Sequence, residues 1–242
     1  MPTAEIQDLI VRYFPPATHP YRVLERRIDL AVRAGTRVLD VGCGRTAPDL
    51  ARLRGRGAHL MGIDLVAFTV QDPELELRAA SVEKMTGIAD GSIDFAYSRA
   101  VMEHVDAPAL AFAEIARVLA PGGRYLALTP SFWDYGSLVA WIVPNIYHGW
   151  LVKRLEGRAE EDTFPTRYRA NTRSAVERFA RGAGLEVSHF EYLGQYPNYL
   201  AWSRTLFRIG CFYERLIARI PLFHPLLGWI LFEVRKPAGP VA

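Results

Sequence analysis

The sequence is poor in cysteine and has almost no excess of charge. Its two cysteines, Cys43 and Cys211, offer no framework of disulfide bonds among 242 residues and are typical of a reducing compartment. The formal net charge is only +3, which excludes the broad basic surface of a general nucleic-acid binder. The first residues lack a basic segment followed by an apolar run, so we expect no secretory signal and a cytoplasmic location.

Patterns of metal ligands are missing as well. The six histidines show no HxxxH spacing or similar cluster, so we expect no metal site. Apolar residues, in contrast, are plentiful, because 50% of the chain is hydrophobic. A chain of this length and composition can bury a substantial core, and we expect one domain over residues 1–242.

Strand and helix signals alternate along the first half of the chain. Strands are predicted at residues 37–41, 59–63, 75–79, 93–97 and 124–128, and helices at residues 4–14, 21–32, 48–53 and 107–119. Such alternation predicts a parallel sheet that is covered by helices on both faces. A ligand is then expected beyond the carboxyl ends of the strands, beside the first one.

A glycine turn follows the first predicted strand. Gly42 and Gly44 allow a ligand to approach the backbone closely, and Asp40 places a carboxylate just before them. This carboxylate would repel the pyrophosphate of a dinucleotide, whereas it would attract the ammonium and sulfonium groups of S-adenosylmethionine. Asp40 therefore favours the methyl donor. Downstream, Thr46 is predicted to cap the next helix, with Pro48 in its first turn.

The same turn admits a second interpretation. Gly42, Gly44 and Ala47 match the loose dinucleotide pattern, and Asp64 follows Gly44 by 20 positions, as the acidic residue of that pattern requires. A nicotinamide-dependent oxidoreductase therefore stays open as the alternative enzyme.

Five motifs together carry a family resemblance. They are VLDVGCG at residues 38–44, GIDL at 62–65, DGSIDF at 90–95, VMEHV at 101–105 and RVLAPGG at 117–123. In order and spacing the chain resembles the class I S-adenosylmethionine-dependent methyltransferases of the type 11 group, most clearly over residues 30–130. More weakly, residues 184–190 and 228–237 resemble the last two strands of that fold.

The resemblance implies a donor site formed by Asp40, Gly42, Cys43, Gly44, Asp64, Leu65, Ser81, Val82 and Ser98. Asp64 would accept both ribose hydroxyls, which suits a carboxylate. Ser81 stands where relatives usually have an aspartate at the adenine ring, and the Val82 amide can serve a ring nitrogen. Ser98 would lie under the methionine portion of the donor.

His104 is the candidate general base. In the family its position lies near methyl transfer, and an imidazole is suited to removing a proton from an acceptor hydroxyl at neutral pH. A histidine that packs or bonds to the backbone is the alternative at this position.

An aromatic insertion interrupts the second half of the chain. Residues 135–152 are 18 uncharged residues, which is the lower limit for a membrane span. Because Pro144, Asn145, His148 and Gly149 lie inside this run, a substrate lid containing Trp141, Tyr147 and Trp150 is the favoured interpretation.

A basic stripe follows near the C-terminus, formed by Arg204, Arg208, Arg215 and Arg219 on a predicted helix. Arginines on an apolar helix are typical of an element at a membrane surface. A packed helix whose arginines cover apolar surface with their stems is an equal alternative.

The combined prediction is a doubly wound α/β domain with a seven-stranded, mostly parallel sheet. Its parts are a helical cap at residues 1–35, a donor-binding half at 36–130, an inserted lid at 131–170 and an acceptor side with an extra apolar helix at 171–242. We expect methyl transfer from S-adenosylmethionine to oxygen of a small, hydrophobic or lipid-linked acceptor, at or near the inner face of the membrane. A non-catalytic donor-binding protein at a membrane is the remaining alternative.

Overall fold

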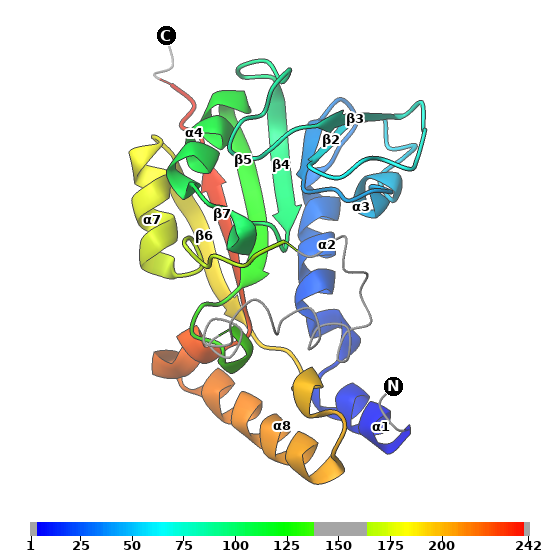
Figure 1. The fold of residues 1–242 in the computed structure, drawn as a ribbon, viewed down its shortest axis with the longest axis vertical. Helices are drawn as coiled ribbons and strands as arrows, with labels where there is room; N and C mark the ends of the chain where they lie inside the picture. The colour runs from blue at the N-terminus through cyan, green and yellow to red at the C-terminus, as the bar shows by residue number, and fades with distance from the viewer. Residues whose placement is uncertain (1–3, 138–163, 240–242) are drawn as a thin grey trace.

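The computed structural model describes residues 4–137 and 164–239. At its centre lies a seven-stranded sheet of order β3-β2-β1-β4-β5-β7-β6 (Figure 1). The strands are β1 (Arg37–Val41), β2 (His59–Asp64), β3 (Leu75–Ala79), β4 (Ile93–Arg99), β5 (Leu119–Pro130), β6 (Glu186–Leu193) and β7 (Trp229–Arg235). Strand β7 pairs antiparallel with β5 and β6, and the other pairings are parallel. The predicted doubly wound α/β fold is confirmed.

Helices cover both faces of the sheet (Figure 1). Helices α2 (Pro20–Ala31) and α3 (Pro48–Ala51) pack on one face, and α4 (Pro108–Val118) and α7 (Arg173–Gly182) pack on the other. Side chains cap the N-termini of α2 and α7. The His19 side chain accepts a hydrogen bond from the Tyr21 amide, and the Thr172 side chain accepts one from the Ala175 amide. Each face has its own core, and together these cores hold the strand ends in place.

The start of α3 differs from the prediction that Thr46 caps it. The N-cap is Ala47, which has φ 44° and ψ 53° and makes no side-chain cap bond. The prediction at Thr46 was wrong because a residue before proline avoids the right-handed helical region, and Pro48 is the first residue of α3. Ala47 therefore takes the left-handed conformation between the glycine turn and the helix.

Beyond the carboxyl ends of the parallel strands lies a smaller helical layer (Figure 1). It contains α1 (Ala4–Tyr13) and α8 (Arg204–Arg219), with the short turns η1 (Pro16–Thr18), η4 (Asn198–Leu200) and η5 (Pro221–Leu226). Phe207 and Cys211 of α8 pack against Ile6 of α1 in a third apolar cluster. The layer therefore closes over the end of the sheet where this fold class binds ligands.

Most of the predicted lid lies outside the described residues. Residues 138–163 contain Trp141, Tyr147 and Trp150 and most of the uncharged run at 135–152, so its structure stays untested. Among the helices of residues 4–137 and 164–239, none combines the length and apolar character needed to span a membrane.

Candidate functional site

The glycine turn after β1 brings the backbone close to a neighbouring loop. Gly42 has φ +78°, and a Cβ built on it would lie 2.3 Å from Cγ2 of Val101. Gly44 also has a positive φ, of +73°, which a larger side chain would strain. Both glycines are thus required by the geometry, and they expose backbone atoms to the space beyond β1.

Asp64 closes this turn from the end of β2. Its Oδ2 accepts a hydrogen bond of 2.7 Å from the Gly44 amide, and its Oδ1 accepts one of 3.1 Å from the Val66 amide. The carboxylate is therefore held across the glycine turn. Since each carboxylate oxygen has two lone pairs, both oxygens can still accept a further bond from a ligand.

A pocket of about 500 Å³ opens at these strand ends. Its walls include Gly42, Gly44, Asp64, Leu65, Ser81, Val82 and His104 of the predicted site residues. It lies at the carboxyl ends of β1, β2 and β4, where the chain order of the sheet reverses. The volume falls in the range of small-molecule sites.

Three predicted site residues do not line this pocket. Asp40 is 3% exposed and Ser98 is fully buried, and Cys43 lies beneath the turn with its Sγ against Gly62. The Ser98 hydroxyl is 2.6 Å from the Tyr125 hydroxyl. Burial, followed by the nearby Asp49, raises the pKa of Asp40 well above its usual value. Of the two acidic residues predicted for the site, Asp64 lines the pocket and Asp40 does not.

Glu83 was missed by the sequence interpretation and stands beside Ser81. The Ser81 hydroxyl accepts a bond from the Glu83 amide, whereas Oε1 of Glu83 accepts bonds of 2.8 and 2.9 Å from the amides of Asp106 and Ala107. Glu83 also lines the pocket, so an acidic side chain is present two residues after the position where the usual aspartate is lacking.

His104 ends the short turn η2 (Met102–His104) and lines the same pocket. Its Nδ1 lies 3.2 Å from the Pro165 carbonyl oxygen, which can only accept, so Nδ1 carries the proton. Nε2 is then the basic nitrogen, and Oε1 of Glu103 lies 3.8 Å from it. Glu103 is buried, and Thr129 donates a 2.8 Å bond to its Oε2. The buried Glu103 carboxyl group thus lies next to the basic nitrogen of His104.

Tyr21 and Arg99 complete the pocket, although no motif indicated them. The Arg99 guanidinium lies 5.0 Å from the centre of the Tyr21 ring and forms a 3.0 Å ion pair with Asp49. Tyr21 comes from the first turn of α2, far from the other lining residues along the chain. The sequence pattern around Tyr21 predicts only that a helix forms there. Which turn of this helix reaches the pocket depends on how α2 packs on the sheet.

No three His, Cys, Asp or Glu side chains of residues 4–137 and 164–239 come together as a possible metal site.

Comparison with known proteins finds similarity to methyltransferases over part of the chain. The family model of the type 11 methyltransferase domain matches residues 39–127. The ubiquinone biosynthesis O-methyltransferase of Xanthomonas oryzae pv. oryzae is 34% identical over 126 residues, which cover 47% of this chain and 50% of that protein. The chain thus spans about half the length of this curated relative.

Solved structures share the fold at low identity. An S-adenosylmethionine-dependent methyltransferase from Mesorhizobium loti aligns with a TM-score of 0.60 and 18% identity, covering 90% of this chain and 98% of the other. Geranyl diphosphate C-methyltransferase from Streptomyces coelicolor A3(2) aligns with a TM-score of 0.59 and 16% identity, covering 89% and 79%. The sheet order and these matches show that the chain has the class I methyltransferase fold and that residues 39–127 are similar to the methyltransferase domain of the family model.

Proposed function

We propose that the pocket binds S-adenosylmethionine and that the protein transfers its methyl group to oxygen of a small hydrophobic acceptor. The observation that carries this proposal is the Asp64 carboxylate, held 2.7 Å from the Gly44 amide across the glycine turn. This amide is one that a dinucleotide pyrophosphate would need, and here it already serves an anion. A cationic donor with a ribose diol is complementary to such a turn, which disfavours the nicotinamide alternative.

The residues present fit this donor from end to end. Asp64 accepts hydrogen bonds from the ribose hydroxyls, next to Leu65, and Ser81 and Val82 border the adenine. At the opposite end Arg99 and Tyr21 offer a cation and an aromatic ring for the methionine carboxylate and amine. Asp40, Cys43 and Ser98 support the turn from below without touching the donor.

His104 is the proposed proton acceptor. The bound donor supplies an electrophilic methyl group on a sulfonium, whose thioether is a good leaving group, so alignment provides much of the rate. His104 takes the hydroxyl proton of the acceptor at Nε2, and Glu103 3.8 Å away stabilises the resulting charge. A base in this position supports transfer to oxygen, as the name of the Xanthomonas relative describes, over transfer to carbon.

The donor proposal is tested by calorimetry on the full chain. We expect S-adenosylmethionine and S-adenosylhomocysteine each to bind at one site, and NADH and NADPH to give no heat of binding. Because both classes of ligand contain adenosine, adenosine alone serves as the control for binding of the shared part. Binding of NADH without binding of either methyl-donor ligand would overturn the proposal.

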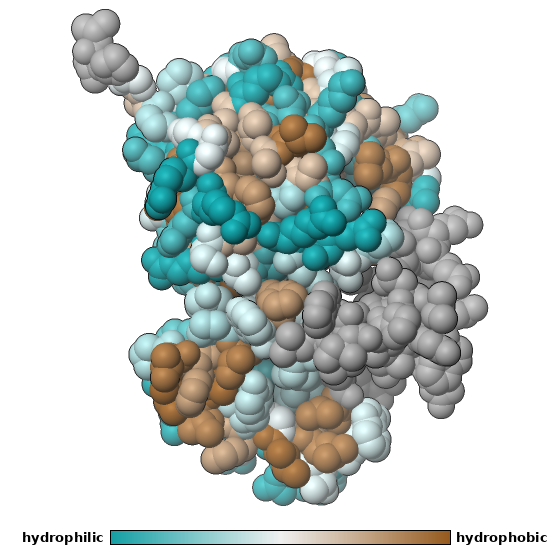
Figure 2. Space-filling model, turned by 60° about the vertical axis from the view of Figure 1, so that its left-hand side comes forward, coloured by the Kyte–Doolittle hydropathy of each residue, from teal (hydrophilic) through white to brown (hydrophobic). Residues whose placement is uncertain are grey.

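The same proposal includes contact with a membrane surface. Large apolar side chains are exposed on α8 and on η5, and hydrophobic areas gather on the lower part of the molecule (Figure 2). This apolar face consists of Ile209, Phe212, Leu216, Ile220, Leu222 and Phe223. Phe212 is 69% exposed and Leu222 is 81% exposed, which is unusual for apolar residues without a partner.

The charges beside the apolar face favour an anionic lipid surface as its partner. Arg208 and Arg219 are exposed on α8, whereas Arg204 forms an ion pair of 2.9 Å with Glu5 and Arg215 lies over the Tyr13 ring. A helix with an apolar face and arginines along its edge is suited to the boundary between headgroups and acyl chains. Contact there would give the acceptor side direct access to hydrophobic or lipid-linked substrates.

Sedimentation with vesicles tests this contact. We expect the protein to sediment with phosphatidylglycerol vesicles at low salt, and the double variant Phe212→Ser and Leu222→Ser to stay in the supernatant. Arg208→Gln with Arg219→Gln should weaken association by about 1 kcal/mol per arginine, and high salt should have a similar effect.

The matched control is Leu110→Ser, because Leu110 is 56% exposed on α4, away from the apolar face. Equal sedimentation of the wild type and the Phe212 and Leu222 variant, or none by the wild type, would contradict membrane contact and leave donor binding unaffected.

A further inference from the structure

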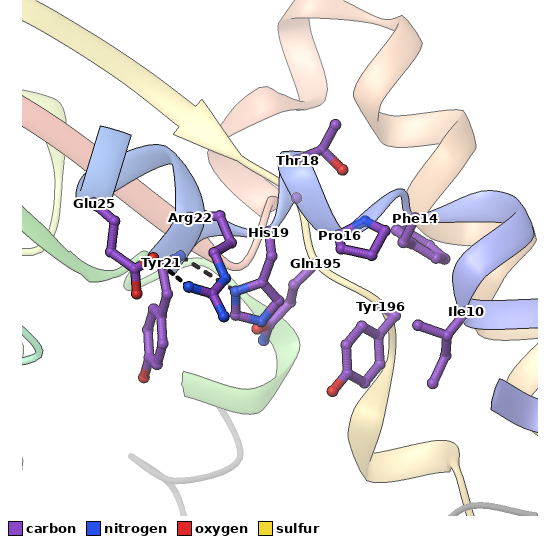
Figure 3. A pocket seen from close by; sticks show the side chains of 11 residues that line it. Ile10, Phe14, Pro16, Thr18, His19, Tyr21, Arg22, Glu25, Gln195 and Tyr196 are labelled. Carbon is purple, nitrogen blue, oxygen red and sulfur yellow. Dashed lines mark hydrogen bonds and ion pairs between the residues drawn. The ribbon is translucent and has the colours of Figure 1, made fainter. Parts of the chain in front are cut away.

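A second pocket lies beside the donor pocket, between the helical cap and the segment that follows β6. Its volume is about 340 Å³, and its walls include Ile10, Phe14, His19, Tyr21, Gln195 and Tyr196. Figure 3 shows the His19 ring between Tyr21 and Tyr196, with Gln195 beside it. The volume is sufficient for one ring with a short apolar chain.

Tyr21 connects this pocket to the donor site, because the residue lines both pockets. Its ring is held in place on two sides. The Arg99 guanidinium lies 5.0 Å from the ring centre, and the Trp229 ring meets it edge-on at 5.3 Å. A molecule in the second pocket is therefore separated from the donor by the width of one fixed side chain.

The pocket wall is aromatic. Phe14 meets Tyr196 edge-on at 6.4 Å, His19 meets Tyr21 edge-on at 5.2 Å, and His19 lies 6.3 Å from Tyr196. Rings in such edge-on arrangements offer both faces and edges to another ring.

The polar groups of this pocket carry no unbalanced charge. Arg22 forms an ion pair with Glu25 at 2.5 Å. Nδ1 of His19 accepts a bond from the Tyr21 amide, which places the proton of the neutral ring on Nε2. Burial, and next the nearby Arg22, lowers the pKa of His19, so the ring is neutral at neutral pH.

Gln195 adds a second neutral donor. Its Oε1 accepts a 2.8 Å bond from Nε1 of Trp229, and this contact leaves the amide NH₂ group as a donor. The pocket thus combines aromatic walls with N–H donors on His19 and Gln195. A ligand oxygen can accept from them, whereas an anionic group would find no net positive charge.

We propose that this second pocket binds an uncharged aromatic molecule whose hydroxyl or carbonyl oxygen accepts hydrogen bonds from His19 and Gln195. The inference goes beyond the proposed function, because it concerns a ligand of a second pocket that Tyr21 separates from the donor pocket. It excludes a diphosphate-bearing ligand at this place.

The test uses 4-hexylphenol as the neutral probe and 4-hexylbenzoate as its anionic counterpart. Binding of each to the full chain is measured by calorimetry in the presence of saturating S-adenosylhomocysteine. We expect 4-hexylphenol to bind at least about 10-fold more tightly than 4-hexylbenzoate, because the buried anion lacks a cationic partner.

Two variants locate the probe in the pocket. His19→Asn keeps the cap of α2, because asparagine is a good N-cap residue, but it removes the Nε2 donor. We expect this variant to bind 4-hexylphenol about 3- to 10-fold more weakly. Tyr196→Leu removes an aromatic ring from the pocket wall and should also lower the affinity for 4-hexylphenol. His59→Asn, exposed at the start of β2, is the matched control and should leave both affinities unchanged.

Equal affinity of 4-hexylphenol for the wild type and both pocket variants would overturn the inference, as would equal or tighter binding of 4-hexylbenzoate. Binding of S-adenosylhomocysteine in the same samples distinguishes failure of the pocket inference from failure of the proposed function. If this ligand binds normally while the pocket prediction is contradicted, the proposed function stands, whereas no binding to the wild type would contradict the proposed function itself.

Discussion

Replacing His104 by asparagine is expected to lower kcat about 10²- to 10⁴-fold while donor affinity stays nearly unchanged. The reason is that Nε2 is the basic nitrogen of a ring fixed through Pro165, with the Glu103 carboxylate 3.8 Å away. The measurement is formation of S-adenosylhomocysteine with a phenolic acceptor found in an activity screen. Calorimetry with S-adenosylhomocysteine on the same samples reports donor affinity.

His59→Asn serves again as the control, because His59 is exposed at the amino end of β2. Equal turnover in the wild type and the His104 variant would remove the base from the mechanism. In that case alignment of the donor and the acceptor would account for the rate. A parallel loss of donor affinity would instead assign His104 to the binding site.

Replacing Asp64 by alanine should weaken binding of S-adenosylmethionine by about 1–3 kcal/mol, or about 5- to 150-fold. Two effects combine, since the ribose hydroxyls lose a charged acceptor and the Gly44 amide loses its 2.7 Å bond. Calorimetry with S-adenosylmethionine measures the change. Asp64→Asn retains one acceptor oxygen without the charge, so its affinity should fall between those of the wild type and the alanine variant.

The control is Asp90→Ala, because Asp90 is an exposed acid that pairs with Arg117 on the surface. Thermal denaturation of each variant shows whether the fold is retained. Unchanged donor affinity in a folded Asp64→Ala protein would mean that the ribose lies elsewhere, and the argument from the glycine turn would fail with it.

Local sequence determined the sheet and the glycine turn. Strand β1 is a short apolar run, and the turn after it needs glycine at residue 42 because a Cβ there would clash with Val101. Strands that alternate with helices favour a parallel sheet with crossovers, so the position of the pocket at the strand ends also followed from the sequence. The family resemblance predicted Asp64 for the donor site, and Asp64 ends β2 beside β1 and lines the pocket.

Burial and charge at single positions needed the tertiary structure. Asp40 lies in β1 close to the glycines, yet it is 3% exposed and does not line the pocket. Strand position tells which end of the sheet a residue occupies, but neighbouring helices decide which side chains are covered. The contribution of Tyr21 was missed for that reason.

Periodicity likewise predicted α8 but left its orientation open. Its repeat is compatible with burying either apolar stripe, and packing on α1 selected the side that contains Phe207 and Cys211. The opposite stripe, with Ile209, Phe212 and Leu216, stayed exposed beside the arginines. Sequence by itself thus determined the elements and their order, because these depend on local propensity and spacing. Tertiary packing decided the exposed faces and the second pocket, since both arise between segments that are far apart along the chain.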